Sequence, residues 1–183
     1  MRSLTSAVLL FTALVIGASP ATAQQKRISP HETISAVFEK NRVTLVYGRP
    51  YSKDPKTGEM RKIWGGLVPY GRPWRTGADE ATLLITQNPI VLGGTVIPAG
   101  AYTLFTQPEA DGTAKLIVSS QIGQWGLQYN PAKDFARVDL TRSAIETPVD
   151  QFTMELAKNP AGGGLLKMRW ENTEYSVAYT LQK

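Results

Sequence analysis

Segments near the C-terminus alternate between apolar and polar residues with a period of two. The pattern is clearest in QFTMELAK (151–158), LKMRWE (166–171) and YSVAYTLQ (175–182). Such alternation buries one face of a strand and leaves the other in water, which is typical of an antiparallel sheet. We therefore predict three strands here, with the glycine-rich NPAGGG (159–164) as the loop between the first two.

Shorter apolar stretches upstream are bounded by turn residues. TISAVF (33–38) and RVTLVY (42–47) are predicted to pair across Glu39–Asn41. IVLGGTVI (90–97) is predicted to form a tight hairpin, because its Gly-Gly pair supplies the positive φ angles that such a turn needs. Further predicted strands are YTLFTQ (102–107) and AKLIVSS (114–120), which the turn PEADG (108–112) separates.

These patterns together predict an all-β protein. The chain offers about ten short strands and no helix longer than a turn or two, which favours a single antiparallel sandwich or flattened barrel. The one anomaly is a long stretch, from Gly48 to about Asp79, without regular alternation. Loops beyond roughly 15 residues are uncommon unless they are functional or pack on themselves. We expect this aromatic, Gly/Pro-rich loop to pack on the sheet.

The first 23 residues have the features of a cleaved signal peptide. Arg2 gives a positive start, Ala7–Ile16 forms a 10-residue apolar run, and Ala21–Ala23 fits a small-residue cleavage site before Gln24. The apolar run is shorter than the ~20 residues of a membrane span. We therefore predict an exported, soluble protein, periplasmic or extracellular, with one domain over residues 24–183 and no transmembrane segment. The sequence contains no cysteine, which excludes disulfides and thiol chemistry.

Residues 62–82, KIWGGLVPYGRPWRTGADEAT, are the most unusual part of the irregular stretch, and we call them the signature segment. They include two tryptophans, four glycines and two prolines. Large aromatic side chains at such positions are expected to fold back over the sheet and complete its core. Arg75 is then expected to pair with Asp79 or Glu80. This packing role is favoured over a direct role in ligand binding, which remains the alternative.

The ligand-binding alternative rests on charge and on a second aromatic segment. Residues 49–75 have seven basic and two acidic side chains, a net charge of +5, whereas the rest of the mature chain is close to neutral. A solvated loop is the simpler explanation, and a surface for an anionic partner is the other. QWGLQYN (124–130), the second aromatic segment, is proposed to line the same site. The candidate ligand-binding residues are Trp64, Tyr70, Arg72, Trp74, Arg75, Glu80, Trp125 and Tyr129.

Several motifs together resemble a bacterial exported family known only as a domain of unknown function, DUF2911. The signature segment carries the resemblance, together with SPHETISAVF (29–38), IPAGAYTLFTQP (97–108), GQWGLQYN (123–130) and the MRWE strand (168–171). The resemblance spans nearly the whole mature chain. It departs from the family pattern at YSKDPKTGEM (51–60), which is longer than usual, and at the NPAGGG loop. The resemblance implies a secreted β-rich domain and brings no established activity with it.

Residues for catalysis are few. His31, the only histidine, lies near the predicted mature N-terminus, where a surface role is the simpler reading. One histidine without cysteine argues against zinc, and no calcium-loop motif occurs, so we expect no metal and no cofactor. Asp79 and Glu80 would point to opposite faces of an extended segment. An exported protein is also a poor candidate for nucleic-acid binding.

The sequence thus favours a non-catalytic binding or envelope-associated accessory protein that uses residues 62–82 as its ligand or partner face. The partner would be an envelope glycan, an anionic lipid or another protein. Two alternatives remain open. One is a hydrolase of envelope glycans with Glu80 as its acid or base, and the other is a purely structural domain whose loop completes the core.

Overall fold

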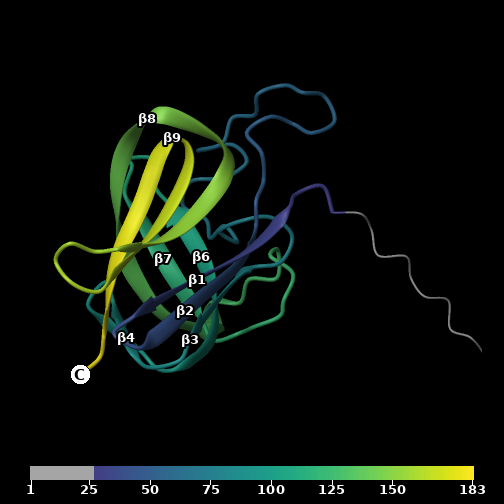
Figure 1. Ribbon diagram of the computed structural model, residues 1–183. Coiled ribbons are helices and arrows are strands. Elements are labelled where there is room, and N and C mark those ends of the chain that lie inside the picture. The colour runs from purple at the N-terminus through teal and green to yellow at the C-terminus, as the bar shows by residue number, and fades with distance from the viewer. Residues whose placement is uncertain (1–26) are drawn as a thin grey trace, which may run out of the picture.

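The structure, a computed structural model, describes residues 27–183 (Figure 1). The predicted signal peptide lies outside these residues. The strands are β1 (His31–Phe38), β2 (Asn41–Gly48), β3 (Thr82–Thr86), β4 (Ile90–Leu92), β5 (Thr95–Ile97), β6 (Gly100–Pro108), β7 (Ala114–Ser119), β8 (Asp134–Lys158) and β9 (Gly164–Leu181). Within the described part of the chain, the only helical element is the short 3-10 helix η1 (Pro131–Lys133).

All nine described strands belong to one antiparallel sheet in the order β1-β2-β3-β6-β7-β8-β9-β4-β5. The all-β prediction is therefore confirmed, and the sheet does not close into a barrel. Figure 1 shows the long β8–β9 hairpin curving across β6 and β7. The Thr106 hydroxyl of β6 contacts the Met168 sulfur of β9 at 3.6 Å, so the two halves of the sheet face each other.

Two predicted hairpins form as their turn residues require. Phe38 pairs with Asn41, which leaves Glu39 and Lys40 as a two-residue turn with φ angles of 47° and 67°. The β4–β5 hairpin turns at Gly93 and Gly94, with φ angles of 52° and 84°. Positive φ at both central residues is the geometry that matches the twist of paired strands.

The C-terminal strands differ from their predicted boundaries. The segments predicted as separate strands 166–171 and 175–182 form the single strand β9, and Glu171, with φ of 49°, marks an irregularity inside it. Strand β8 also begins earlier than predicted, at Asp134. Its middle, residues 141–150, is mostly exposed and shifts register against β9, so that stretch lacks the alternation by which strands are predicted.

One large core lies between the two halves of the sheet. Tyr47 of β2 meets Phe152 of β8 edge-on at a centroid distance of 6.0 Å, and the Tyr47 hydroxyl accepts from the Met154 backbone N–H at 3.0 Å. Trp170 of β9 is fully buried in the same core. The long connection between β2 and β3 is packed against this core. Over residues 27–183, no helix has both the length and the apolar character that a membrane span requires.

Candidate functional site

Trp74 anchors the signature segment to the sheet. Its backbone exchanges two hydrogen bonds of 2.8 Å with Thr106 of β6. Its ring is only 7% exposed, stacks on Trp170 at 5.7 Å and meets Phe152 edge-on at 5.1 Å. Trp74 therefore completes the core, and that burial fixes the path of the residues that follow it.

The first half of the signature segment forms a compact turn. Trp64 is half-buried and meets Tyr175 of β9 edge-on at 5.3 Å. Gly65 has φ of 75°, and an added Cβ there would lie 2.5 Å from the Tyr70 ring, so this ring packs directly on the turn. Tyr70 and Arg72 are exposed and lie outside the pocket described next. Trp64 does not line the pocket either, so none of the three candidate residues in this half of the segment contributes to it.

A pocket of about 660 Å³ opens beside the second half of the signature segment. Its wall is built from residues 27–29, from the loop 50–61, from residues 74–79 and from Trp125, with Leu67 at one side. Ligand pockets in proteins typically measure ~300–1,000 Å³. Trp74, Arg75 and Trp125 are therefore the candidate residues that the fold brings together at one cavity.

Arg75 is the most unusual side chain in the pocket wall. Its side chain donates no hydrogen bond to any described residue, and its Nε is buried without an acceptor. Burial lowers the pKa of Arg75, while the nearby Asp79 carboxylate opposes that shift. Buried polar groups are nearly always hydrogen-bonded in proteins. Among the described residues, the Arg75 guanidinium therefore has no hydrogen-bond partner at the pocket wall.

Asp79 lines the pocket four residues later, in the left-handed backbone region with φ of 65°. Its carboxylate accepts no hydrogen bond from a described residue, and its Oδ2 lies 3.7 Å from His31 Nε2. Because Asp79 is not extended, it does not alternate with Glu80, and both carboxylates approach His31. The segment is thus not extended at Asp79, and the condition under which the two carboxylates would point to opposite faces is not met.

Glu80 is paired outside the pocket wall. Its carboxylate accepts from Arg27 and lies 3.2 Å from His31 Nε2. Among the described residues, Arg75 forms an ion pair with neither Asp79 nor Glu80, so the predicted pairing of Arg75 does not form. Arg27 and His31 take that place, because β1 runs beside β2 and brings this part of the chain to the end of the signature segment.

Trp125 reaches the pocket because the second aromatic segment is bonded to the signature segment. The Gly126 N–H donates to the Asp79 carbonyl at 3.0 Å, and the Ala81 N–H donates to the Gln124 carbonyl at 3.4 Å. A Cβ on Gly126 would lie 2.0 Å from Arg75 Cδ, so only glycine allows this approach. The Trp125 residue stays 46% exposed on the pocket wall.

The matched family model, described as "Protein of unknown function (DUF2911)", covers residues 29–179. The chain belongs to the DUF2911 family. The match includes every pocket residue except Arg27 and Ile28. Comparisons with curated proteins and with solved structures find no match. The family assignment predicted from the motifs is confirmed, and the chemistry of this DUF2911 pocket must be argued from its own residues.

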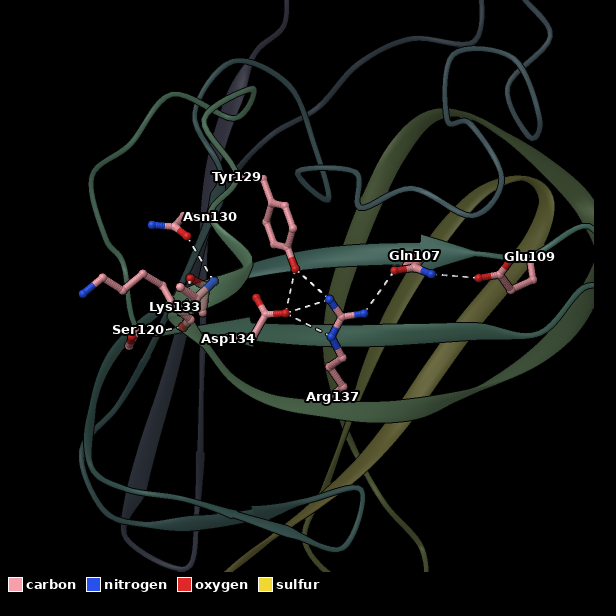
Figure 2. A network of polar contacts seen from close by, with 10 residues as sticks. Gln107, Glu109, Ser120, Tyr129, Asn130, Lys133, Asp134 and Arg137 are labelled. Atoms are coloured by element: carbon pink, nitrogen blue, oxygen red, sulfur yellow. Dashed lines mark hydrogen bonds and ion pairs between the residues drawn. The ribbon is translucent and has the colours of Figure 1, made fainter.

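Tyr129 lies away from the pocket of this DUF2911 chain. Its ring packs on Phe105 at 4.9 Å, on the outer side of the sheet. Figure 2 shows its hydroxyl directed at Asp134 and Arg137, at 2.6 Å and 2.8 Å. Burial, and then the hydrogen bond to Asp134, raise the pKa of Tyr129 to about 12. Tyr129 therefore holds the second aromatic segment on the sheet and does not line the pocket.

Sequence reasoning missed much of the pocket wall. Asp54, Lys56 and Arg61 line it from the loop 50–61. The Asp54 carboxylate accepts from the Lys56 backbone N–H at 2.8 Å, and this bond lowers the pKa of Asp54 and shapes the loop. The Arg61 guanidinium donates to the Tyr51 carbonyl, while its Nε is buried without an acceptor. The basic charge of this loop was the signal that the sequence offered.

The basic bias of residues 49–75 is divided between structure and pocket. Arg49 contributes to structure, since it lies 3.2 Å from Glu32 and donates to the Thr153 hydroxyl at 2.8 Å. The pocket wall takes four basic side chains, Arg27, Lys56, Arg61 and Arg75, against the carboxylates of Asp54 and Asp79. In residues 27–183, no group of three or more His, Cys, Asp or Glu side chains is arranged to hold a metal ion.

Proposed function

We propose that this protein binds a small anionic ligand in the pocket formed by Arg75, Asp79 and Trp125, as a non-catalytic, envelope-associated accessory protein. The observation that carries the proposal is the unpaired Arg75 guanidinium in the wall of a ligand-sized cavity. An exported location, which would bring the pocket into contact with envelope glycans or anionic lipids, is part of the proposal and follows from the N-terminal sequence pattern alone.

The charge of the pocket wall supports an anion. Arg27 is already paired with Glu80, so Lys56, Arg61 and Arg75 oppose the carboxylates of Asp54 and Asp79, which leaves a formal excess of +1. Arginine presents its donors in a planar fork that matches a carboxylate or a phosphate. A hydrogen bond to a charged group is worth about 1.5–3 kcal/mol, so one such fork supplies a substantial part of the affinity for a small ligand.

Local backbone geometry also supports a functional role for this part of the signature segment. Thr76 and Asp79 both have positive φ angles, 53° and 65°. For the β-branched Thr76 this conformation is unfavourable by about 1–3 kcal/mol, and such strain tends to occur at functional sites. The buried Thr76 hydroxyl bonds Thr106 at 2.8 Å, and its carbonyl accepts from the Thr82 hydroxyl at 2.6 Å. These bonds hold Arg75 and Asp79 at the pocket wall.

The test measures the binding of benzoate, citrate and glucuronate to the purified protein, by calorimetry and by tryptophan fluorescence. We expect at least one probe to bind and Arg75→Gln to weaken it about tenfold or more. Arg72→Gln is the matched control, because Arg72 belongs to the same segment, is exposed and lies outside the pocket. Failure of all three probes, or equal effects of the two variants, would overturn the proposal.

The hydrolase alternative is less well supported. Glu80, its proposed acid or base, is engaged by Arg27 and His31 and does not line the pocket. The Glu80→Gln variant separates the two functions, since a binding protein keeps its affinity for the probe, whereas a hydrolase loses turnover on an envelope glycan. Glycan turnover that disappears in Glu80→Gln would favour the enzyme.

A further inference from the structure

Arg75 and Asp79 carry opposite charges in the same pocket wall and do not pair with each other. Each has one buried atom without a hydrogen bond, Nε in Arg75 and Oδ2 in Asp79. The remaining donors and acceptors of both groups also have no partner among the described residues. The two buried atoms are closed to a ligand, so the Arg75 Nη nitrogens and the Asp79 Oδ1 are the groups that the pocket offers, and the two charges still act on each other, since Asp79 opposes the lowering of the Arg75 pKa by burial.

We infer that the ligand of this pocket is an anionic sugar, a hydroxyl-bearing ring that carries a carboxylate or a phosphate. The inference rests on the proposed anion-binding function and specifies its ligand class. The acid group is placed at Arg75, with Arg61 as the second guanidinium of the same wall. A ring hydroxyl then donates to the Asp79 carboxylate, which a ligand with acceptors alone would leave unsatisfied.

Trp125 supplies the third contact. Its indole is half-exposed on the pocket wall and is held in place by the bond from Gly126 to Asp79. The face of an aromatic ring carries partial negative charge, so the C–H bonds on one face of a sugar ring pack favourably against it. The cavity of about 660 Å³ has room for more than one sugar ring. Trp74, in contrast, contacts the pocket only as a buried floor.

A free amino acid is the competing ligand, since its carboxylate and ammonium would also match Arg75 and Asp79. The net charge of the pocket wall argues against it, because a zwitterion leaves the formal excess of +1 uncompensated. The size of the cavity argues the same way. An acidic sugar, or a short acidic glycan, compensates the excess charge and fills more of the space.

The experiment compares five probes on the purified protein by calorimetry: glucuronate, glucose 6-phosphate, glucose, benzoate and glutamate. Glucuronate or glucose 6-phosphate is expected to bind at least about tenfold more tightly than each of the other three, because only these two satisfy all three contacts. The stronger of the two identifies carboxylate or phosphate as the acid group. Trp125→Ala is expected to lower the affinity for that sugar about tenfold, because the C–H contacts with the indole face are lost.

Two substitutions at Asp79 separate a sugar from an amino acid. Asn and Gly both tolerate the left-handed backbone at this position, so both variants are expected to fold. Asp79→Gly removes the acceptor and is expected to lower the affinity for the sugar about tenfold. Asp79→Asn keeps an oxygen for the hydroxyl and is expected to change sugar binding less than about threefold. A ligand with an ammonium group would instead bind Asp79→Asn at least about tenfold more weakly, because the negative charge that pairs with the ammonium is gone.

The outcomes separate binding of an acidic sugar from binding of anions in general. If benzoate or glutamate binds as tightly as the acidic sugars and Arg75→Gln weakens all of them, the sugar inference is wrong and anion binding stands. If no probe binds in a manner that depends on Arg75, the proposed function is wrong as well. Tighter binding of an acidic sugar with the stated Asp79 and Trp125 effects supports both.

Discussion

The signature segment (residues 62–82) and the second aromatic segment (residues 124–130) have similar compositions, but their tryptophans differ in burial. Both carry tryptophan beside glycine, and both cross the sheet as irregular chain. Trp74 inserts between the halves of the sheet and is 7% exposed, whereas Trp125 remains 46% exposed at the pocket. A large aromatic side chain in a loop can therefore belong to the core or remain at the surface, and the elements packed beside it decide which.

The reason for the difference lies in what each segment bonds to. Trp74 is bonded by its backbone to Thr106, in the central strand β6, which directs the ring into the core next to Trp170. Trp125 is bonded to the signature segment itself, through the bridge with Glu80, and so lies one layer further out. The signature segment is thus packed on the sheet at Trp74, whereas the second segment is anchored to the sheet at Tyr129 and bonded to the signature segment around Trp125.

The largest expected effect is on the free energy of unfolding. Trp74→Ala is expected to lower it by about 3–5 kcal/mol, because the change leaves a cavity among Trp170, Phe152 and the sheet. Trp125→Ala is the matched control and is expected to cost less than about 1 kcal/mol, as a half-exposed residue. Urea unfolding measures both, and similar losses in the two variants would contradict the comparison.

A substitution at the junction of the two segments is expected to have an intermediate effect. Gly126→Ala places a Cβ 2.0 Å from Arg75 Cδ and 2.7 Å from the Asp79 carbonyl oxygen. We expect a loss of about 1–3 kcal/mol in stability from overpacking, together with weaker binding of the anionic probe. Unfolding and calorimetry on the same preparations measure the two effects.

The control for this junction is Gly123→Ala, just before the second aromatic segment. Gly123 has open space around it and φ of 77°, so alanine there costs about 1–2 kcal/mol through the backbone alone. Probe binding should be retained in this variant. If Gly123→Ala lowers the affinity for the probe as much as Gly126→Ala does, then the contact between Gly126 and Arg75 is not what shapes the pocket.

The smallest expected effect concerns pH and the outer anchor of the second aromatic segment. The fold raises the pKa of Tyr129 to about 12 from an unfolded value of about 10, so the fold favours the neutral phenol. The stability contributed by this shift is fully present below pH 10 and is lost as the pH rises through 12. Urea midpoints at pH 9 and pH 11 should therefore differ less in Tyr129→Phe than in the unsubstituted protein.

This pH dependence should be reduced and not abolished in Tyr129→Phe. Tyr47 in β2 has its pKa raised to about 12, mainly by burial, and contributes over the same range with the same sign. Tyr47→Phe provides the comparison in the core. An unchanged difference between the two pH values in Tyr129→Phe would show that the Asp134 and Arg137 network does not hold the neutral phenol.

Much of the fold could be predicted because local turn chemistry specifies it. Glu39-Lys40 and Gly93-Gly94 set two hairpins, and strict alternation marks the inward faces of β8 near Phe152 and of β9. Residues 141–150 could not be predicted as strand, because they are polar, contain a proline and bury neither face. Their strand conformation comes from pairing with β9, which is a long-range interaction.

The candidate site could be predicted only in part. Trp74, Arg75 and Trp125 were identified by residue type, and the fold does bring them to one pocket. Trp64, Tyr70, Arg72, Glu80 and Tyr129 have the same chemistry and lie elsewhere. Asp79 and Arg61 were missed as pocket residues because nothing in their local sequence shows that the fold brings them to one cavity.

By itself, the sequence determined the family, the all-β class and the turns, since these depend on residue type and on spacing along the chain. Only the tertiary structure decided that Trp74 fills the core while Trp125 faces the pocket. It also decided that His31, not Arg75, approaches Asp79 and Glu80. Whether a side chain is buried, paired or free depends on segments distant in sequence, whose approach is set by the packing of the whole sheet.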